Sequence, residues 1–144
     1  MSDRGILKVQ RFKKRNSFPT SMADMLILED QKLNMERLAT SVGRLSIDLV
    51  TNSLDFRKYI DEGNRPALWF LDDRVPDRGH ITGGDFPSFV ENCAYLLERL
   101  PNAKVYYTGT FPEPGAMNYL REHEIKLVEK SDIAKIVQEE LPNV

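Results

Sequence analysis

Residues 67–76 constrain the fold of this chain more than any other stretch. Five apolar residues, 67–71, run directly into the adjacent carboxylates of Asp72 and Asp73, and Pro76 follows four residues after Asp72. A run this short and this apolar is typical of a strand buried on both faces of a parallel sheet. In open α/β folds the carboxyl ends of such strands form binding sites. Carboxylates beside an apolar strand resist desolvation, so the sequence predicts a functional site at this end of the strand.

Apolar runs and helical spacing predict five strands that alternate with five helices. The strands are expected over residues 25–28, 48–51, 67–71, 103–108 and 125–129, and the helices over residues 31–42, 54–62, 87–100, 116–122 and 133–141. Ser53 and Asp132 are predicted to cap the second and last helices, Gly63 to end the second, and Pro87 to lie in the first turn of the third. This alternation is typical of an α/β protein with a doubly wound parallel sheet and helices on both faces.

Composition indicates one ordinary soluble domain. The chain has 144 residues, of which 41% are hydrophobic and 29% charged, and its net charge of −2 argues against nucleic acid or an anionic membrane as the main partner. No apolar run approaches the roughly 18 residues of a membrane span. The single cysteine, Cys93, excludes an internal disulfide and is predicted to be an inert core thiol, like the core residue Trp69. We expect a cytoplasmic protein.

Residues 1–24 form a basic N-terminal extension, with six lysines and arginines against two acids. Residues 25–144 are predicted to form the domain itself. Within the extension, the amphipathic stretch 5–12 is compatible with a short strand, a helical turn or a disordered tail. The extension is therefore either solvated or an arm that docks on a partner or on its own domain.

Polar residues stand at the carboxyl ends of four of the predicted strands. They are Glu29 and Asp30 after the first, Asp72 and Asp73 after the third, Thr108 as the last residue of the fourth and Lys130 after the fifth. The carboxyl ends of parallel strands lie on one edge of the sheet, so these residues are expected to converge. Carboxylates suit a hard cation such as Mg²⁺, and an ammonium with a hydroxyl suits the oxygens of a phosphoryl group.

These residues resemble a known family. In order and spacing, Glu29-Asp30, Leu71-Asp72-x-x-x-Pro76, Tyr107-Thr108-Gly109 and Lys130 resemble the receiver domain of two-component response regulators, the CheY-like family, over about residues 24–141. Each piece alone is a weak signal, whereas the ordered set at four strand ends is specific. The resemblance implies a flavodoxin-like sheet with strand order 2-1-3-4-5.

The resemblance also implies a role for each site residue. Asp72 corresponds to the aspartate that accepts a phosphoryl group from a histidine kinase or phosphotransfer protein. Glu29 and Asp30 correspond to the acidic pair that holds Mg²⁺ with Asp72, and the backbone carbonyl of Arg74 to a further ligand. Asp30 has an alternative role as the cap of the helix that follows it. Asp73 is predicted to be an exposed neighbour rather than a ligand.

Thr108 and Lys130 correspond to the hydroxyl and the ammonium that contact the transferred phosphoryl group. From the residues alone, simple packing in a strand is the alternative role of Thr108, and a structural ion pair to one of the acids is the alternative role of Lys130.

Three features depart from the family pattern. Ser131 follows Lys130 where a proline is usual, and Leu127 stands where an aromatic residue is often found. The loop over residues 77–86 is several residues longer than expected. It contains three glycines and His80 and is either a lid, a partner contact or an ordinary loop.

The sequence therefore predicts a stand-alone, single-domain response regulator rather than an enzyme in the usual sense. Phosphorylation of Asp72 would switch a protein-interaction surface that a downstream effector protein reads, without direct binding to nucleic acid or membrane; a homodimer stays open. The alternative is a receiver-like interaction scaffold that works without phosphorylation, which Ser131 and Leu127 favour. A Mg²⁺-dependent phosphohydrolase ranks last, because it would need an acid at the position of Arg74.

Overall fold

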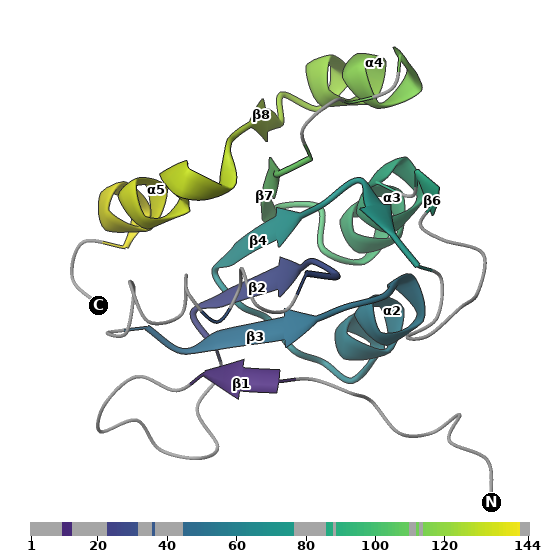
Figure 1. The fold of residues 1–144 in the computed structure, drawn as a ribbon. Helices are drawn as coiled ribbons and strands as arrows, with labels where there is room; N and C mark the ends of the chain where they lie inside the picture. The colour runs from purple at the N-terminus through teal and green to yellow at the C-terminus, as the bar shows by residue number, and fades with distance from the viewer. Residues whose placement is uncertain are drawn as a thin grey trace, which may run out of the picture.

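The computed structural model describes residues 10–12, 23–31, 36, 45–76, 86–87, 89–109, 112 and 114–141. A six-stranded sheet has the order β1-β3-β2-β4-β7-β8 (Figure 1). Its strands are β1 (Gln10–Phe12), β2 (Met25–Leu28), β3 (Ile47–Val50), β4 (Leu68–Leu71), β7 (Lys104–Tyr107) and β8 (Lys126–Leu127). A separate antiparallel pair consists of β5 (Arg74–Val75) and β6 (Phe86–Pro87). The helices are α2 (Ser53–Asp61), α3 (Phe89–Arg99), α4 (Pro114–Glu122) and α5 (Ile133–Glu140), with the 3-10 turn η2 (Lys130–Asp132) before α5.

Five of the six sheet strands are parallel and follow the order β3-β2-β4-β7-β8. In chain order this is 2-1-3-4-5, so the predicted α/β class and strand order are confirmed. Leu28 is paired with Leu71, and Leu71 with Tyr107, so β2, β4 and β7 end at the same level. The residues that follow these strands therefore emerge along one edge of the sheet.

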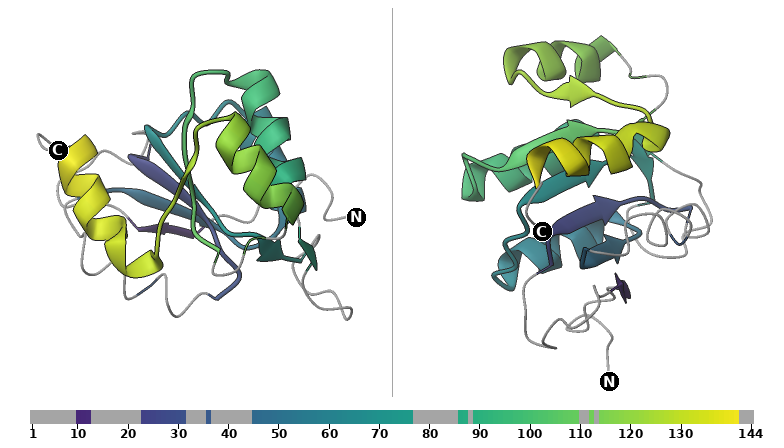
Figure 2. Two further views of the ribbon diagram at one scale, coloured as in Figure 1. Left: turned by 90° about the horizontal axis from the view of Figure 1, so that it is seen from above. Right: turned by 90° about the vertical axis from the view of Figure 1, so that its left-hand side faces the viewer.

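The core lies in two layers on opposite faces of the sheet. Successive side chains along each strand point to opposite faces of the sheet. Leu26 and Trp69 therefore lie in the layer under α2, α3 and α4, whereas Ile27 and Phe70 lie in the layer under α5. Figure 2 shows α5 on one side of the sheet, with α3 and α4 on the other. None of the helices in the described part of the chain is long and apolar enough to cross a lipid bilayer.

Trp69 and Cys93 are core residues, as predicted. Trp69 is 1% exposed and makes edge contacts with Phe56 and Tyr59, while Cys93 is completely buried. Burial raises the pKa of the Cys93 thiol to about 12, which leaves it protonated and unreactive at neutral pH.

The start of α2 differs from the prediction that Ser53 caps it. The cap is Asn52, whose side-chain oxygen accepts a hydrogen bond of 2.8 Å from the N–H of Asp55. The Ser53 hydroxyl instead accepts a bond of 2.9 Å from the side-chain amide of Asn92 and so ties α2 to α3. The predicted end of α2 is confirmed, because Gly63 has a φ of +93° that favours glycine.

The start of the third helix also differs from the prediction, and so does the capping of the last one. Pro87 lies in β6, paired with Arg74, and α3 begins only at Phe89. The last helix, α5, begins at Ile133 as predicted, and Asp132 lies in the cap position, but its side chain makes no capping hydrogen bond. The helix predicted over residues 31–42 lies largely outside the described residues, although Glu36 within it is helical.

The basic extension contributes β1, which pairs with β3 in the antiparallel direction. Nε and Nη2 of Arg11 lie 2.5 and 2.7 Å from the two carboxylate oxygens of Asp48. The Tyr59 hydroxyl donates a further bond of 2.7 Å to Asp48, whose side chain is completely buried. Of the three alternatives for this stretch, the structure has a short strand at residues 10–12, and its arginine neutralises a buried acid.

Gly109 at the end of β7 has no room for a side chain. A Cβ atom there would lie 2.6 Å from Cζ of Tyr107 and closer still to its hydroxyl oxygen, and the Tyr107 ring is fully buried. We expect Gly109→Ala to lower the free energy of unfolding by about 1–3 kcal/mol, because the ring must shift. Urea unfolding followed by circular dichroism measures the effect. Gly115→Ala in α4 is the matched control, since no heavy atom lies within 4 Å of its Cβ position. Equal midpoints for the two variants would contradict this expectation.

Candidate functional site

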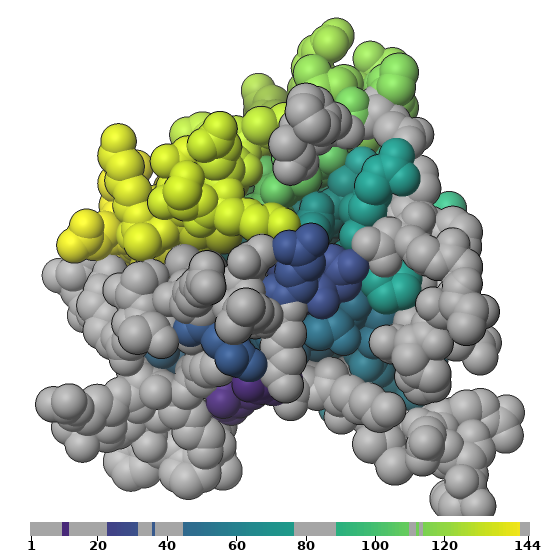
Figure 3. All heavy atoms as spheres, viewed as in Figure 1, coloured from purple at the N-terminus to yellow at the C-terminus, as the bar shows by residue number. Residues whose placement is uncertain are grey.

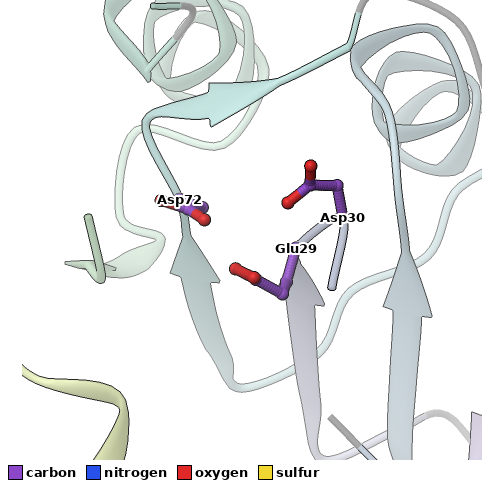
Figure 4. Close-up of side chains that lie close together, drawn as sticks. All are labelled: Glu29, Asp30 and Asp72. Carbon is purple, nitrogen blue, oxygen red and sulfur yellow. The ribbon is translucent and has the colours of Figure 1, made fainter. Parts of the chain in front are cut away.

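The backbone of the sheet fixes the positions of three predicted site residues. The N–H of Glu29 donates to the carbonyl of Val50, that of Asp72 to Leu28 and that of Thr108 to Leu71, at 3.1, 3.0 and 2.9 Å. Each residue thus continues the hydrogen bonding of its strand by one step. Figure 4 shows the side chains of Glu29, Asp30 and Asp72 together beyond the ends of β2 and β4.

These three carboxylates form a compact acidic cluster. One oxygen from each of Glu29, Asp30 and Asp72 lies within 4.8 Å of the others. Glu29 is completely buried, Asp72 is 9% exposed and Asp30 is half-buried. In Figure 3 the segment that contains β2, in blue, reaches the surface between yellow-green and teal parts of the chain, so this edge is open to solvent. Ionised carboxylates this close repel one another, so the cluster favours a cation among its three acids.

Lys130 supplies a positive charge to this cluster from η2. Its Nζ lies 2.9 and 2.7 Å from the two carboxylate oxygens of Glu29 and 3.4 Å from Oδ2 of Asp72. Partial burial acts to lower the pKa of Lys130, but the contacts with Glu29 and Asp72 outweigh it and raise the pKa. Lys130 is therefore protonated at neutral pH.

Burial is the main cause that raises the pKa of Glu29, to about 8, and the neighbouring Asp72 adds to it. Lys130 acts in the opposite direction without cancelling the burial. A buried acid of this kind, with two further carboxylates close by, suits a hard divalent cation that replaces the missing hydration. The cluster of Glu29, Asp30 and Asp72 could hold such an ion.

No protein-family model and no curated protein matches the sequence, whereas solved structures do match the fold. A response regulator receiver domain protein (CheY-like) from Methanospirillum hungatei has a TM-score of 0.61 at 14% identity, over 85% of this chain and 95% of that one. The phosphorylated cyanobacterial phytochrome response regulator RcpA has a TM-score of 0.58 at 18% identity, over 83% and 91%. A DNA-binding response regulator of the LuxR family from Staphylococcus aureus has a TM-score of 0.52 at 26% identity, over 76% and 88%.

The chain has the fold of a receiver domain. Within this receiver fold, the acidic cluster and Lys130 lie at the edge where the resemblance in sequence predicts them.

The other predicted residues lie around this edge. Thr108 is buried at the end of β7, in the strand next to that of Asp72. Arg74 begins β5 with its side chain exposed. Leu127 on β8 is 46% exposed, so this receiver fold presents an aliphatic side chain where an aromatic one is often found. His80 and the rest of the loop over residues 77–85 lie outside the described residues.

Asp73 was predicted to be exposed, and this is wrong. Its side chain is 4% exposed, its N–H donates to Oδ1 of Asp72 at 2.7 Å, and its own Oδ1 accepts a bond of 3.3 Å from the N–H of Phe89. Phe89 is the first residue of α3, so the carboxylate lies at the start of that helix. No local pattern in the sequence links residue 73 with residue 89, which is why this contact was missed.

Proposed function

We propose that this receiver fold is a phosphorylatable switch in which Asp72 accepts a phosphoryl group from a histidine kinase or a phosphotransfer protein. The observation that carries the proposal is the position of the Lys130 ammonium between Glu29 and Asp72. This arrangement sets a positive charge and two further acids, in a metal-compatible cluster, directly beside the carboxylate of Asp72. In a protein that used the fold only as a scaffold, Lys130 would serve only as a structural ion pair.

In the proposed reaction, an oxygen of Asp72 forms a bond to phosphorus while the bond from phosphorus to the donor's histidine nitrogen breaks. The electron pair of the broken bond stays on the imidazole nitrogen. Lys130 neutralises charge on the transferred group, and Thr108 offers it a hydroxyl. Glu29, Asp30, Asp72 and the backbone carbonyl of Arg74 would hold Mg²⁺, which neutralises further charge on the phosphoryl oxygens.

We propose further that the added charge changes a protein-interaction surface and that a downstream effector protein in the cytoplasm reads it, as expected for a single-domain response regulator. The scaffold that works without phosphorylation remains the second candidate. The exposed Leu127 favours the scaffold, because it stands where receiver domains often have an aromatic residue that responds to phosphorylation.

Incubation with Mg²⁺ and acetyl phosphate should add the mass of one phosphoryl group to the wild-type chain. Asp72→Asn should gain nothing, because its amide is not a nucleophile. Asp61→Asn is the control, since Asp61 is an exposed acid at the end of α2. Intact-mass spectrometry decides between the candidates, and an unmodified wild type would favour the scaffold.

Binding of Mg²⁺ is a separate expectation. Trp69 is buried in β4, three residues before Asp72, so its fluorescence should respond when the acidic cluster binds an ion. We expect a saturable change with a dissociation constant of about 1 mM or below. Asp30→Asn should weaken the binding, because it removes the most accessible of the three carboxylates. A titration that is flat for the wild type would argue against a metal site.

A further inference from the structure

Asp73 is a buried carboxylate that the proposed reaction does not use. A buried charge is unfavourable unless other groups compensate it. Its Oδ1 accepts a hydrogen bond of 3.3 Å from the N–H of Phe89, the first residue of α3. An acid at the start of a helix is favourable, because it satisfies a free N–H group and the positive end of the helix dipole. The side chain of Asp73 is thus held by α3.

The backbone of the same residue holds the proposed phosphoacceptor. The N–H of Asp73 donates a short hydrogen bond of 2.7 Å to Oδ1 of Asp72. The other oxygen of Asp72, Oδ2, lies 3.4 Å from Nζ of Lys130. The two oxygens therefore have different environments, and only Oδ2 faces the lysine.

The charge of Asp73 also acts on the end of β7. The ring of Tyr107 is fully buried, and this burial is the main cause that raises the pKa of its phenol; the charge of Asp73 adds to it. That ring packs edge-on against Phe89, with ring centroids 4.7 Å apart. Tyr107 directly precedes Thr108, so the surroundings of Asp73 include the start of α3 and the strand that carries the proposed hydroxyl group.

We propose that Asp73 is a positioning residue. The start of α3 holds the Asp73 side chain, and this keeps the backbone N–H of Asp73 hydrogen-bonded to Oδ1 of Asp72. That hydrogen bond orients Oδ2 of Asp72 toward the incoming phosphorus. The inference rests on the proposed function of Asp72 and deepens it. It assigns the second acid of the pair a role in geometry, without contact to the phosphoryl group. Because small errors in the placement of a nucleophile slow a reaction strongly, this role has a measurable effect on rate.

The test compares three variants of the full chain. Asp73→Leu fills the space but cannot accept the bond from Phe89, whereas Asp73→Asn retains an oxygen acceptor in the same place. Glu91→Gln is the matched control, because Glu91 is an exposed acid in the first turn of the same helix. The readouts are the phosphorylation rate at saturating acetyl phosphate and Mg²⁺, the dissociation constant for Mg²⁺, and the NMR shift and exchange rate of the residue 73 amide proton.

For Asp73→Leu we expect a rate about tenfold below that of the wild type, a Mg²⁺ dissociation constant changed by less than about twofold, and an amide proton that shifts upfield and exchanges faster. Asp73→Asn should restore the rate to within about threefold of the wild type, and Glu91→Gln should match the wild type. A merely structural role would lower the stability of Asp73→Leu without slowing phosphorylation of its folded form. A folded Asp73→Leu that reacts at the wild-type rate would overturn the proposal.

The amide measurement keeps the test decisive if a variant does not fold or the wild type takes up no phosphoryl group. An unphosphorylated wild type would refute the proposed function. Even then, a residue 73 amide that exchanges slowly in the wild type and faster in Asp72→Ala, which lacks the acceptor, would support the hydrogen bond that positions Asp72. A residue 73 amide that exchanges in the wild type as fast as an exposed loop amide would overturn the positioning role.

Discussion

Replacing Arg11 by methionine is expected to lower the free energy of unfolding by about 3 kcal/mol. The reason is that Asp48 is completely buried in β3 and would lose the guanidinium that contacts both of its oxygens. The Tyr59 hydroxyl would remain as a donor to Asp48 but carries no charge. Urea unfolding at neutral pH measures the difference from the wild type.

Two further variants separate the buried charge from the loss of packing. Arg11→Met combined with Asp48→Asn should be more stable than Arg11→Met alone, because the asparagine leaves no buried charge without a cation. Arg121→Met, at an exposed arginine in the last turn of α4, is the matched control and should lie within about 0.5 kcal/mol of the wild type. If Arg11→Met is as stable as Arg121→Met, β1 does not neutralise Asp48 in solution.

Replacing Lys130 by methionine is expected to slow phosphorylation by acetyl phosphate about a hundredfold or more. Its ammonium contacts both Glu29 and Asp72, so the variant loses a positive charge beside the proposed phosphoacceptor. Lys126→Met is the control, since Lys126 is an exposed lysine on β8. Initial rates at saturating Mg²⁺, measured by intact mass, give the comparison.

The same variant distinguishes a role in the reaction from a structural ion pair. In the wild type, Lys130 competes with a metal ion for Glu29, so Lys130→Met should bind Mg²⁺ more tightly while it reacts more slowly. A purely structural ion pair predicts lower stability with an unchanged phosphorylation rate of the folded variant. That result would remove Lys130 from the proposed site.

The layout of the sheet could be predicted because the apolar runs stop where the polar site residues begin. Residues 25–28 and 67–71 each end at a pair of acids, and β2 and β4 end there in the structure. The strand order itself came from the resemblance to receiver domains, since periodicity alone does not order strands. Helix starts were less predictable, because both Asn52 and Ser53 are good caps and only the folded backbone decides which side chain reaches the free N–H group.

The two missed features depend on contacts between distant residues. Arg11 and Asp48 are 37 positions apart, and Asp73 and Phe89 are 16 apart. Asp48 did carry a signal, because an acid inside the apolar run of β3 needs a cation or donors around it. The sequence offered several basic residues near its start as that partner, and only the antiparallel pairing of β1 with β3 selects Arg11.

The most direct test of the central claim is the position of the phosphoryl group along the chain. Asp72 and Asp73 are adjacent buried acids that contact each other. A variant of one acid that no longer gains the mass of a phosphoryl group therefore does not show which of the two acids carries that group in the wild type. Borohydride reduction after reaction with acetyl phosphate and Mg²⁺ converts an aspartyl phosphate to homoserine, which peptide sequencing by mass spectrometry locates. The account predicts homoserine at residue 72 alone. Homoserine at residue 73, or at neither position, would contradict it.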